Sequence, residues 1–352
     1  MTLTPTESLA TISRERLSVW SSPGVARPIT LILLAVVALF AGRLFSAGLP
    51  SWTAAEAILT QSLFVAVLAF GQGLIMLIGG LDLSIPGVVA LSATIVALST
   101  SVYGVETWLA VLLALIASAL VGLLDGYLIS RFKIPAFIVT LAMGGILIGL
   151  TIGFTFGRQA PSAPPILIEL FSGSGKIFGI GIPIVVFLIV GALGYVIQAR
   201  SRFGRSVHLF GSSPAAARIA GMPVRRIEVS VYVVGALASG VGGIMLLGFS
   251  GNARLSLGDA WLMPAIAAVL VGGTIIGSGF GFWQSTLMAT VLLTTITVVI
   301  GATGLSQGWK DVLYGVIILI ALSFMRRDGG ALKRVFAGLR KTQERPAVQS
   351  AP

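Results

Sequence analysis

Apolar residues occur along the chain in runs long enough to cross a membrane as helices. A spanning α-helix needs about 20 mostly apolar residues, and stretches of roughly this length recur between short polar segments. The pattern predicts an all-α, polytopic membrane protein with about ten transmembrane helices. The predicted spans are 28–45, 57–78, 84–102, 108–129, 135–157, 179–198, 229–249, 262–280, 284–303 and 311–325.

The composition agrees with a membrane protein. The 352 residues are 56% apolar and only 10% charged, with a mean hydropathy of +1.02. Soluble domains carry about 25% charged residues, and disordered chains are poor in apolar residues, so both classes are excluded. The chain has no cysteine and a single histidine, His208. We therefore expect no metal site and no cysteine nucleophile.

The positive charges predict the orientation of the helices. If the N-terminus is cytoplasmic, most of the 23 lysines and arginines fall in cytoplasmic segments. Because cytoplasmic loops carry such an excess, both termini are predicted to be cytoplasmic, and the net charge of +11 reflects topology rather than nucleic-acid binding. This divides the chain into a cytoplasmic segment 1–27, a transmembrane domain 28–325 with a cytoplasmic loop at 199–228, and a basic cytoplasmic tail 326–352.

Motifs for catalysis or nucleotide binding are missing from the sequence. Gly173–Lys176 resembles part of a phosphate-binding loop, but Ile177 stands where that loop needs serine or threonine. We expect no catalytic residue, metal or cofactor in this chain. The few carboxylates, among them Asp82, Asp125 and Asp259, lie near predicted helix ends. An ion-coupled secondary transporter usually has ionisable groups deep in the bundle, and it is the alternative to a passive transport subunit.

The segment Gly79-Gly80-Leu81-Asp82-Leu83-Ser84 interrupts the apolar pattern between two predicted spans. The glycine pair permits unusual backbone angles, Asp82 or Ser84 can cap the next helix, and Pro86 suits a first helical turn. Two interpretations fit. One is a capped turn at the inner membrane surface, and the other is a broken helix whose backbone faces a transport pathway.

The loop after the sixth predicted span contains a short predicted helix. Ser213 can cap this helix, Pro214 opens it and Gly221 ends it. Ala217 and Ile219 are expected to give it an apolar side. That side needs a cover, which is either the membrane interface or a groove on a soluble partner.

A polar hairpin follows the seventh predicted span. Its Asn252 and Asp259 either face a polar solute in the outer mouth of a pathway or belong to an ordinary loop that Trp261 anchors at the interface. Glutamines in or beside the spans suit either solute hydroxyls or ties between helices; they are Gln61, Gln72 and Gln284. The candidate pathway residues are Gln72, Asp82, Ser84, Asn252 and Asp259.

Four motifs resemble those of bacterial ABC-importer permeases of the ribose, xylose and arabinose type. Gly79–Ser84 is similar to the family signature G-G-[IL]-D-L-S. The other matching runs, in the same order as in the family, are Arg131–Leu141, Ala216–Gly221 and Ile266–Thr274. The likeness covers about residues 30–325.

The resemblance implies a permease subunit of the bacterial inner membrane that carries a monosaccharide or similar small polar solute and is not an enzyme. It implies a second permease subunit, identical or homologous, a cytoplasmic ABC ATPase that holds ATP and Mg, and a periplasmic sugar-binding protein. Membrane lipid surrounds the chain, and no nucleic-acid partner is expected. The ATPase is expected to couple through Ser213, Pro214, Ala215, Ala216, Ala217, Arg218 and Gly221.

The chain departs from the family pattern at two places. The family often has Asn-Pro-Glu-Ala-Ala at the coupling helix, whereas this chain has Ser213–Ala217 without an acidic residue. Docking is therefore expected to rely on shape and on Arg218. The family also commonly continues the first motif with Val-Gly, whereas Ile85-Pro86-Gly87 follows here, and the proline should stiffen the turn.

Overall fold

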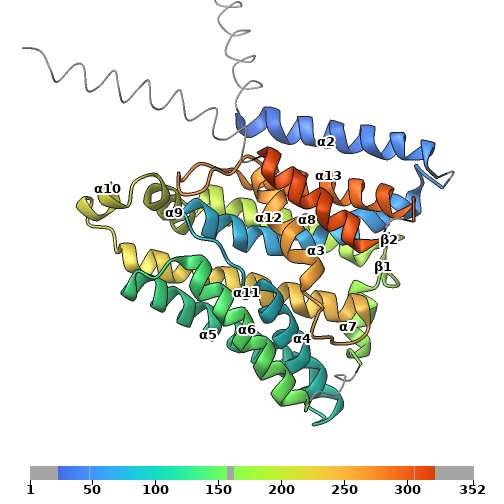
Figure 1. Ribbon diagram of the computed structural model, residues 1–352. Helices are drawn as coiled ribbons and strands as arrows, with labels where there is room; N and C mark the ends of the chain where they lie inside the picture. Colours follow the sequence, from blue (N-terminus) through green and yellow to red (C-terminus); the bar gives the residue numbers. More distant parts are fainter. Residues whose placement is uncertain (1–22, 47, 157–161, 305, 322–352) are drawn as a thin grey trace, which may run out of the picture.

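The computed structural model describes residues 23–46, 48–156, 162–304 and 306–321, and helices form nearly all of this part (Figure 1). One small antiparallel pair, β1 (Lys176–Ile177) with β2 (Ile180–Gly181), is the exception among the named elements. The helices are α2 (Pro23–Ala41), η1 (Gly42–Leu44), α3 (Trp52–Leu77), α4 (Ile85–Ser101), α5 (Thr107–Phe132), α6 (Ala136–Thr155), α7 (Pro165–Phe171), α8 (Ile182–Tyr195), η2 (Val196–Arg200), α9 (Arg202–Ser212), α10 (Pro214–Ile219), α11 (Val224–Ser250), α12 (Asp259–Val271), α13 (Trp283–Gly301) and a helix over 307–321.

Each predicted span overlaps a helix, which confirms an all-α polytopic membrane protein. Among the described residues, seven helical stretches are long and apolar enough to span a membrane, and α4 and α12 are shorter. The count of ten transmembrane helices and the cytoplasmic position of the termini therefore remain predictions. Most of the predicted segment 1–27 and all of the tail 326–352 lie outside the described residues.

The prediction for the span 262–280 is wrong. α12 ends at Val271, and residues 272–282 are not helical. Gly273 has a φ of +86°, a left-handed conformation that ends the helix. Ile275, Ile276 and Phe280 continue the apolar run through this irregular segment, which explains why hydropathy extended the helix too far.

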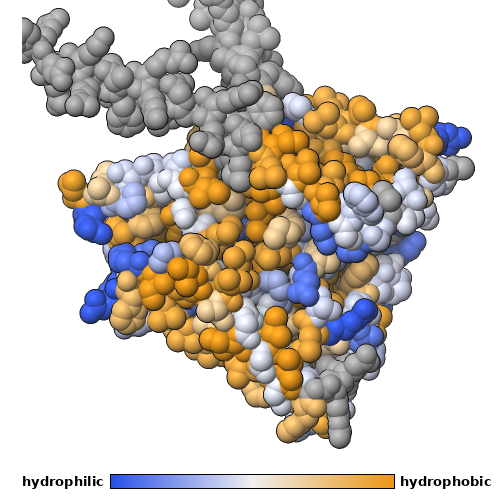
Figure 2. All heavy atoms as spheres, viewed as in Figure 1, coloured by the Kyte–Doolittle hydropathy of each residue, from blue (hydrophilic) through white to orange (hydrophobic). Residues whose placement is uncertain are grey.

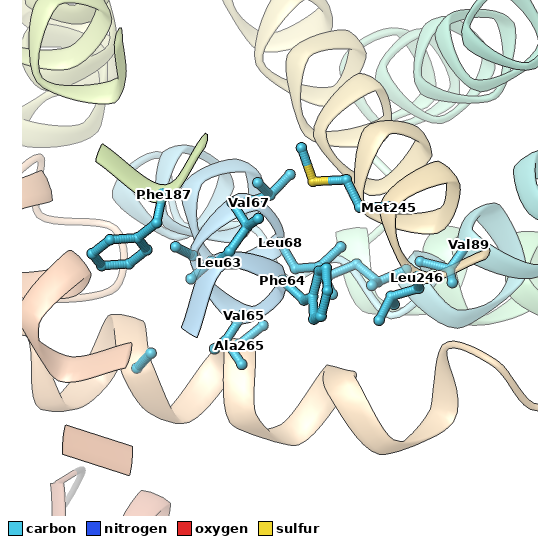
Figure 3. Packing of buried hydrophobic residues seen from close by; sticks show 14 of the residues in the cluster. Leu63, Phe64, Val65, Val67, Leu68, Val89, Phe187, Met245, Leu246 and Ala265 are labelled. Carbon is cyan, nitrogen blue, oxygen red and sulfur yellow. The ribbon is translucent and has the colours of Figure 1, made fainter. Parts of the chain in front are cut away.

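α3 lies at the centre of the bundle. Its Leu63, Phe64 and Leu68 are fully buried, and residues of α4, α8, α11 and α12 surround them (Figure 3). The outer helices α2, α5, α6 and α8 instead expose large apolar side chains, and apolar side chains cover much of the surface in Figure 2. Such surfaces suit contact with lipid.

Glycines bring α5 and α11 into close contact. A Cβ added at Gly122 would lie 2.5 Å from the carbonyl oxygen of Tyr232, and one added at Gly126 would lie 2.8 Å from the Cα of Val229. The four-residue spacing places both glycines on one face, as in other tightly packed membrane helices. This packing positions the side chain of Asp125, which lies between them in sequence.

Candidate functional site

The first helix break connects α3 to α4 through residues 78–84. Gly79 has a φ of +88°, its N–H donates to the carbonyl of Met76 at 3.1 Å, and the N–H of Gly80 donates to the carbonyl of Ile75 at 2.9 Å. This pair of bonds is a Schellman cap. A Cβ at Gly80 would lie 2.3 Å from the hydroxyl oxygen of Tyr232, so α11 packs directly against the break.

Polar side chains hold the rest of this break inside the bundle. Asp82 is 3% exposed, and its Oδ1 accepts hydrogen bonds from the backbone N–H of Ser84 at 2.8 Å and from the Ser84 hydroxyl at 2.6 Å. From α6, the hydroxyl oxygen of Thr140 accepts from the N–H of Leu83 at 3.0 Å and lies 3.1 Å from the carbonyl of Leu81. Of the two sequence interpretations, the buried broken helix is the one that the structure contains.

A second break connects α12 to α13 and repeats the same cap. The N–H of Gly273 donates to the carbonyl of Leu270 at 2.9 Å, and the N–H of Thr274 donates to the carbonyl of Val269 at 3.1 Å. The expected tight packing of this glycine-rich segment is confirmed. A Cβ at Gly272, for example, would lie 2.7 Å from the Cα of Thr286.

The two breaks are hydrogen-bonded to each other. The N–H of Gly277 donates to the carbonyl of Met76 at 2.9 Å, and the N–H of Gly279 donates to the carbonyl of Leu77 at 3.2 Å. A Cβ at Gly79 would also lie 3.3 Å from the Cα of Gly277. The second break therefore pairs with the carbonyl groups at the end of α3.

α9 fixes this pair of breaks from the side. The Nδ1 of His208 lies 2.7 Å from the carbonyl oxygen of Gly279, and because a carbonyl only accepts, Nδ1 carries the proton. A Cβ at Gly211 would lie 2.2 Å from the carbonyl oxygen of Leu77. α9 thus contacts the last turn of α3 and the second break at once.

α10 follows α9 and protrudes at one end of the bundle (Figure 1). Ser213 caps it as predicted, because its Oγ accepts from the N–H of Ala216 at 3.2 Å, and Gly221 ends it with a φ of +73°. The predicted single apolar side is wrong. Ala217 is 4% exposed whereas Ile219 is 89% exposed, since residues two apart lie about 200° apart around a helix.

The remaining residues of the predicted coupling segment lie at the surface around this short helix. Ala215, Ala216 and Arg218 are exposed, Ser213 is half-buried and Pro214 is exposed. The face that α10 turns away from the bundle therefore combines small side chains with one arginine and one isoleucine.

The candidate pathway residues do not form one cluster. Asn252 is exposed in the loop after α11, where its Oδ1 accepts from the Nε of Arg254 at 3.0 Å. Asp259 is exposed at the start of α12. The preceding Gly258 packs against the start of α4, since a Cβ there would lie 2.6 Å from the Cα of Pro86. Asp259 is thus brought toward Ser84, while Asn252 stays apart.

Two buried polar side chains lack a hydrogen bond. Gln72 in α3 is 1% exposed, and neither its amide oxygen nor its amide nitrogen has a partner among the described residues. It does not tie helices together within this part of the chain. Asp125 was expected near a helix end, but it is 2% exposed within α5, and its Oδ1 has no partner among the described residues. Asp125 also interacts electrostatically with Asp82.

Sequence reasoning missed several residues that hold the breaks. Thr140 lies inside the Arg131–Leu141 motif, but nothing in its local pattern indicates that its hydroxyl reaches the first break. Tyr232 sits in a predicted span as an ordinary aromatic residue. His208 was considered only for metal binding, although a lone histidine in a basic loop also offers a directional hydrogen-bond donor.

Over residues 54–322 the chain matches the family described as the permease component of the branched-chain amino acid transport system. Because the match covers most of the chain, the protein belongs to this family of membrane permeases. It is a multi-pass transport subunit of the ABC-importer class in the inner membrane, and it is not an enzyme. The resemblance found in the motifs is confirmed.

Similar proteins carry sugar-import names. The chain is 32% identical over 270 residues to the ribose import permease protein RbsC of Bacillus subtilis, covering 77% of this chain and 84% of the relative. It is 30% identical over 314 residues to the fructose import permease protein FrcC of Rhizobium meliloti, covering 86% and 85%. It is 29% identical over 276 residues to the inner membrane ABC transporter permease protein YjfF of Escherichia coli, covering 76% and 82%.

The role of Thr140 can be tested by removing its hydroxyl group. Thr140→Val leaves the N–H of Leu83 without an acceptor, which should cost about 1–3 kcal/mol and lower the midpoint of thermal unfolding in detergent. Thr151→Val is the matched control, because Thr151 is also fully buried in α6 but its hydroxyl donates only to Leu147 of the same helix. Equal destabilisation by both variants would show that Thr140 does not secure the break.

Proposed function

We propose that this chain is the membrane-spanning subunit of an ATP-driven importer for a monosaccharide or similar small polar solute. A periplasmic binding protein delivers the solute, a second permease subunit completes the membrane part, and a separate ATPase with its ATP and Mg supplies the energy. Family membership and the sugar-import names of the relatives support this proposal. The observation that carries it furthest is the protruding α10, which is linked through α9 to both helix breaks.

The exposed face of α10 is the proposed contact with the ATPase. Ile219 is a large apolar side chain exposed at the tip of the bundle, and a groove on a protein partner would remove it from water. Arg218 beside it supplies charge, while Ala215 and Ala216 permit close approach. Ala217 packs inside the chain and serves to anchor α10 rather than to contact the partner.

Movement of α10 would reach the pathway through α9. Gly211 and His208 connect α9 to Leu77 at the end of α3 and to Gly279 in the second break. A displacement of α9 therefore acts on both breaks together, because each break is hydrogen-bonded to the other. Asp82 and Ser84 lie directly beyond the first break, and we propose that they and Gln72 line the pathway within the bundle, with Asn252 and Asp259 at its entrance.

An ion-coupled secondary transporter is the second candidate. Asp82 and Asp125 are buried and interact electrostatically, and deep carboxylates are typical of such carriers. The family match favours the ATP-driven alternative, and the following experiment separates the two functions.

Reconstitution in proteoliposomes tests the proposed function. D-ribose or D-fructose uptake should require the ATPase, ATP and the solute-binding protein together, and it should fall to background when any one is omitted. Uptake by this chain alone, driven by an imposed proton gradient, would instead establish the secondary transporter.

Substitution of Ile219 tests the proposed ATPase contact. Ile219→Asp places a charge where an apolar side chain is expected to be buried, so association with the ATPase should weaken by at least about tenfold, which corresponds to 1.4 kcal/mol. Phe178→Asp is the control, because Phe178 is equally exposed in the turn between β1 and β2. Copurification in nanodiscs measures the effect, and normal association of the Ile219 variant would remove α10 as the contact.

Two substitutions of His208 test the proposed transmission through α9. His208→Leu loses the donor to Gly279, whereas His208→Asn keeps an N–H near the position of Nδ1. We expect assembly with the ATPase to persist in both variants. Uptake should fall about fivefold to tenfold only in the leucine variant, as expected for one lost hydrogen bond of about 1–1.5 kcal/mol. Identical uptake by the two variants would contradict the proposed link.

A further inference from the structure

A cavity lies between α3, α12, α13 and the helix over 307–321. It encloses about 460 Å³ of empty space, part of it open to solvent, which is within the range of about 300–1,000 Å³ that small-molecule sites occupy. The residues that give it chemical character are Gln61, Trp261, Thr294, Thr297, Lys310 and Tyr314. None of them belongs to the breaks or to the predicted pathway.

We propose that this cavity is a receiving site for a small polyhydroxylated solute, a pentose, hexose or sugar alcohol. The inference rests on the proposed transport function and adds a binding site to it. Amide and hydroxyl groups both donate and accept hydrogen bonds, and lysine donates only. This mixture matches sugar hydroxyls, which also do both. No carboxylate is among the described residues that line the cavity.

Burial explains why the cavity suits a polar occupant rather than a lipid chain. Thr294 and Tyr314 are each 3% exposed, and the Tyr314 hydroxyl is hydrogen-bonded to that of Thr297. Polar groups in an apolar setting are costly unless they find partners, and an acyl chain offers none. Trp261 adds an aromatic surface, whose edge-on contact with Phe64 at 5.5 Å holds it in place.

A polar face of α3 leads inward from the cavity. Gln61 and Gln72 are eleven residues apart in this helix, which corresponds to three turns, so they lie on the same face about 16.5 Å apart along the axis. Gln72 is the buried amide that has no partner among the described residues. An amide of this kind can bind a solute that moves inward from the cavity.

A polar face of α13 runs parallel in the same sense. Thr286, Thr290, Thr294 and Thr297 recur at spacings of four, four and three residues, which places them on one side of the helix. Thr294 and Thr297 line the cavity, and Thr286 contacts Gly272 at the second break. The cavity is thus one end of a hydroxyl-bearing face whose other end touches the proposed moving part.

Single cysteines test the proposal cleanly, because the chain has none of its own. Thr297→Cys and Thr294→Cys are made in the assembled importer and treated with a charged, membrane-impermeant methanethiosulfonate without ATP. We expect reaction from the side opposite α10. D-ribose, D-fructose, D-xylose or myo-inositol should slow the reaction, by about tenfold when the sugar is near nine times its dissociation constant. Glycine betaine at the same concentration should have no effect.

Phe178→Cys, in the exposed turn between β1 and β2, is the control that should react equally with and without sugar. Reaction of both cavity variants with a lipid-soluble maleimide but not with the charged reagent would overturn the proposal in favour of a lipid-filled crevice. Reaction that none of the four solutes slows would overturn it as well. ATP-dependent uptake is measured separately on the same preparations, so a failure of the transport function is distinguished from a failure of the site.

Discussion

A backbone that leaves its helix inside an apolar bundle must find hydrogen bonds within the protein, and this constraint organises the structure. Two helices, α3 and α12, end within the bundle. Each closes its last turn with a glycine in the left-handed conformation, and the groups still unpaired are satisfied across the molecule by Gly277, Gly279 and Thr140. The breaks are therefore components of one hydrogen-bonded unit, and neither is an independent turn.

The position of that unit connects the surface of the bundle with its interior. α9 contacts the unit through His208 and Gly211, and α10 continues directly from α9 to the exposed tip. On the other side, Asp82 and Ser84 lie in the extended part of the first break, whose far end at Pro86 contacts Gly258. A single contiguous set of contacts thus runs from α10 to the start of α12.

The sequence predicts the helices and the break at Gly79 because both depend on local features, namely apolar runs and glycine. It does not predict that Met76 accepts from Gly277, since no local pattern encodes a contact between distant segments. The overextended span at 262–280 has the same cause. Ile275, Ile276 and Phe280 are as apolar outside a helix as within one, and only the φ of Gly273 marks the end. The position of Asp125 was missed because α5 continues to Phe132 and packs on α11 through its glycines.

The pairing of Gly277 with Met76 also has a consequence for biosynthesis. The donor N–H is made about 200 residues after its acceptor, and at roughly 5–20 residues per second the ribosome needs on the order of 10–40 s to reach it. During that interval the end of α3 is without its final partner, even if the helix has already entered the bilayer. The N-terminal half of the protein therefore attains its native arrangement only when the C-terminal half arrives, which makes folding of the two halves a single late event.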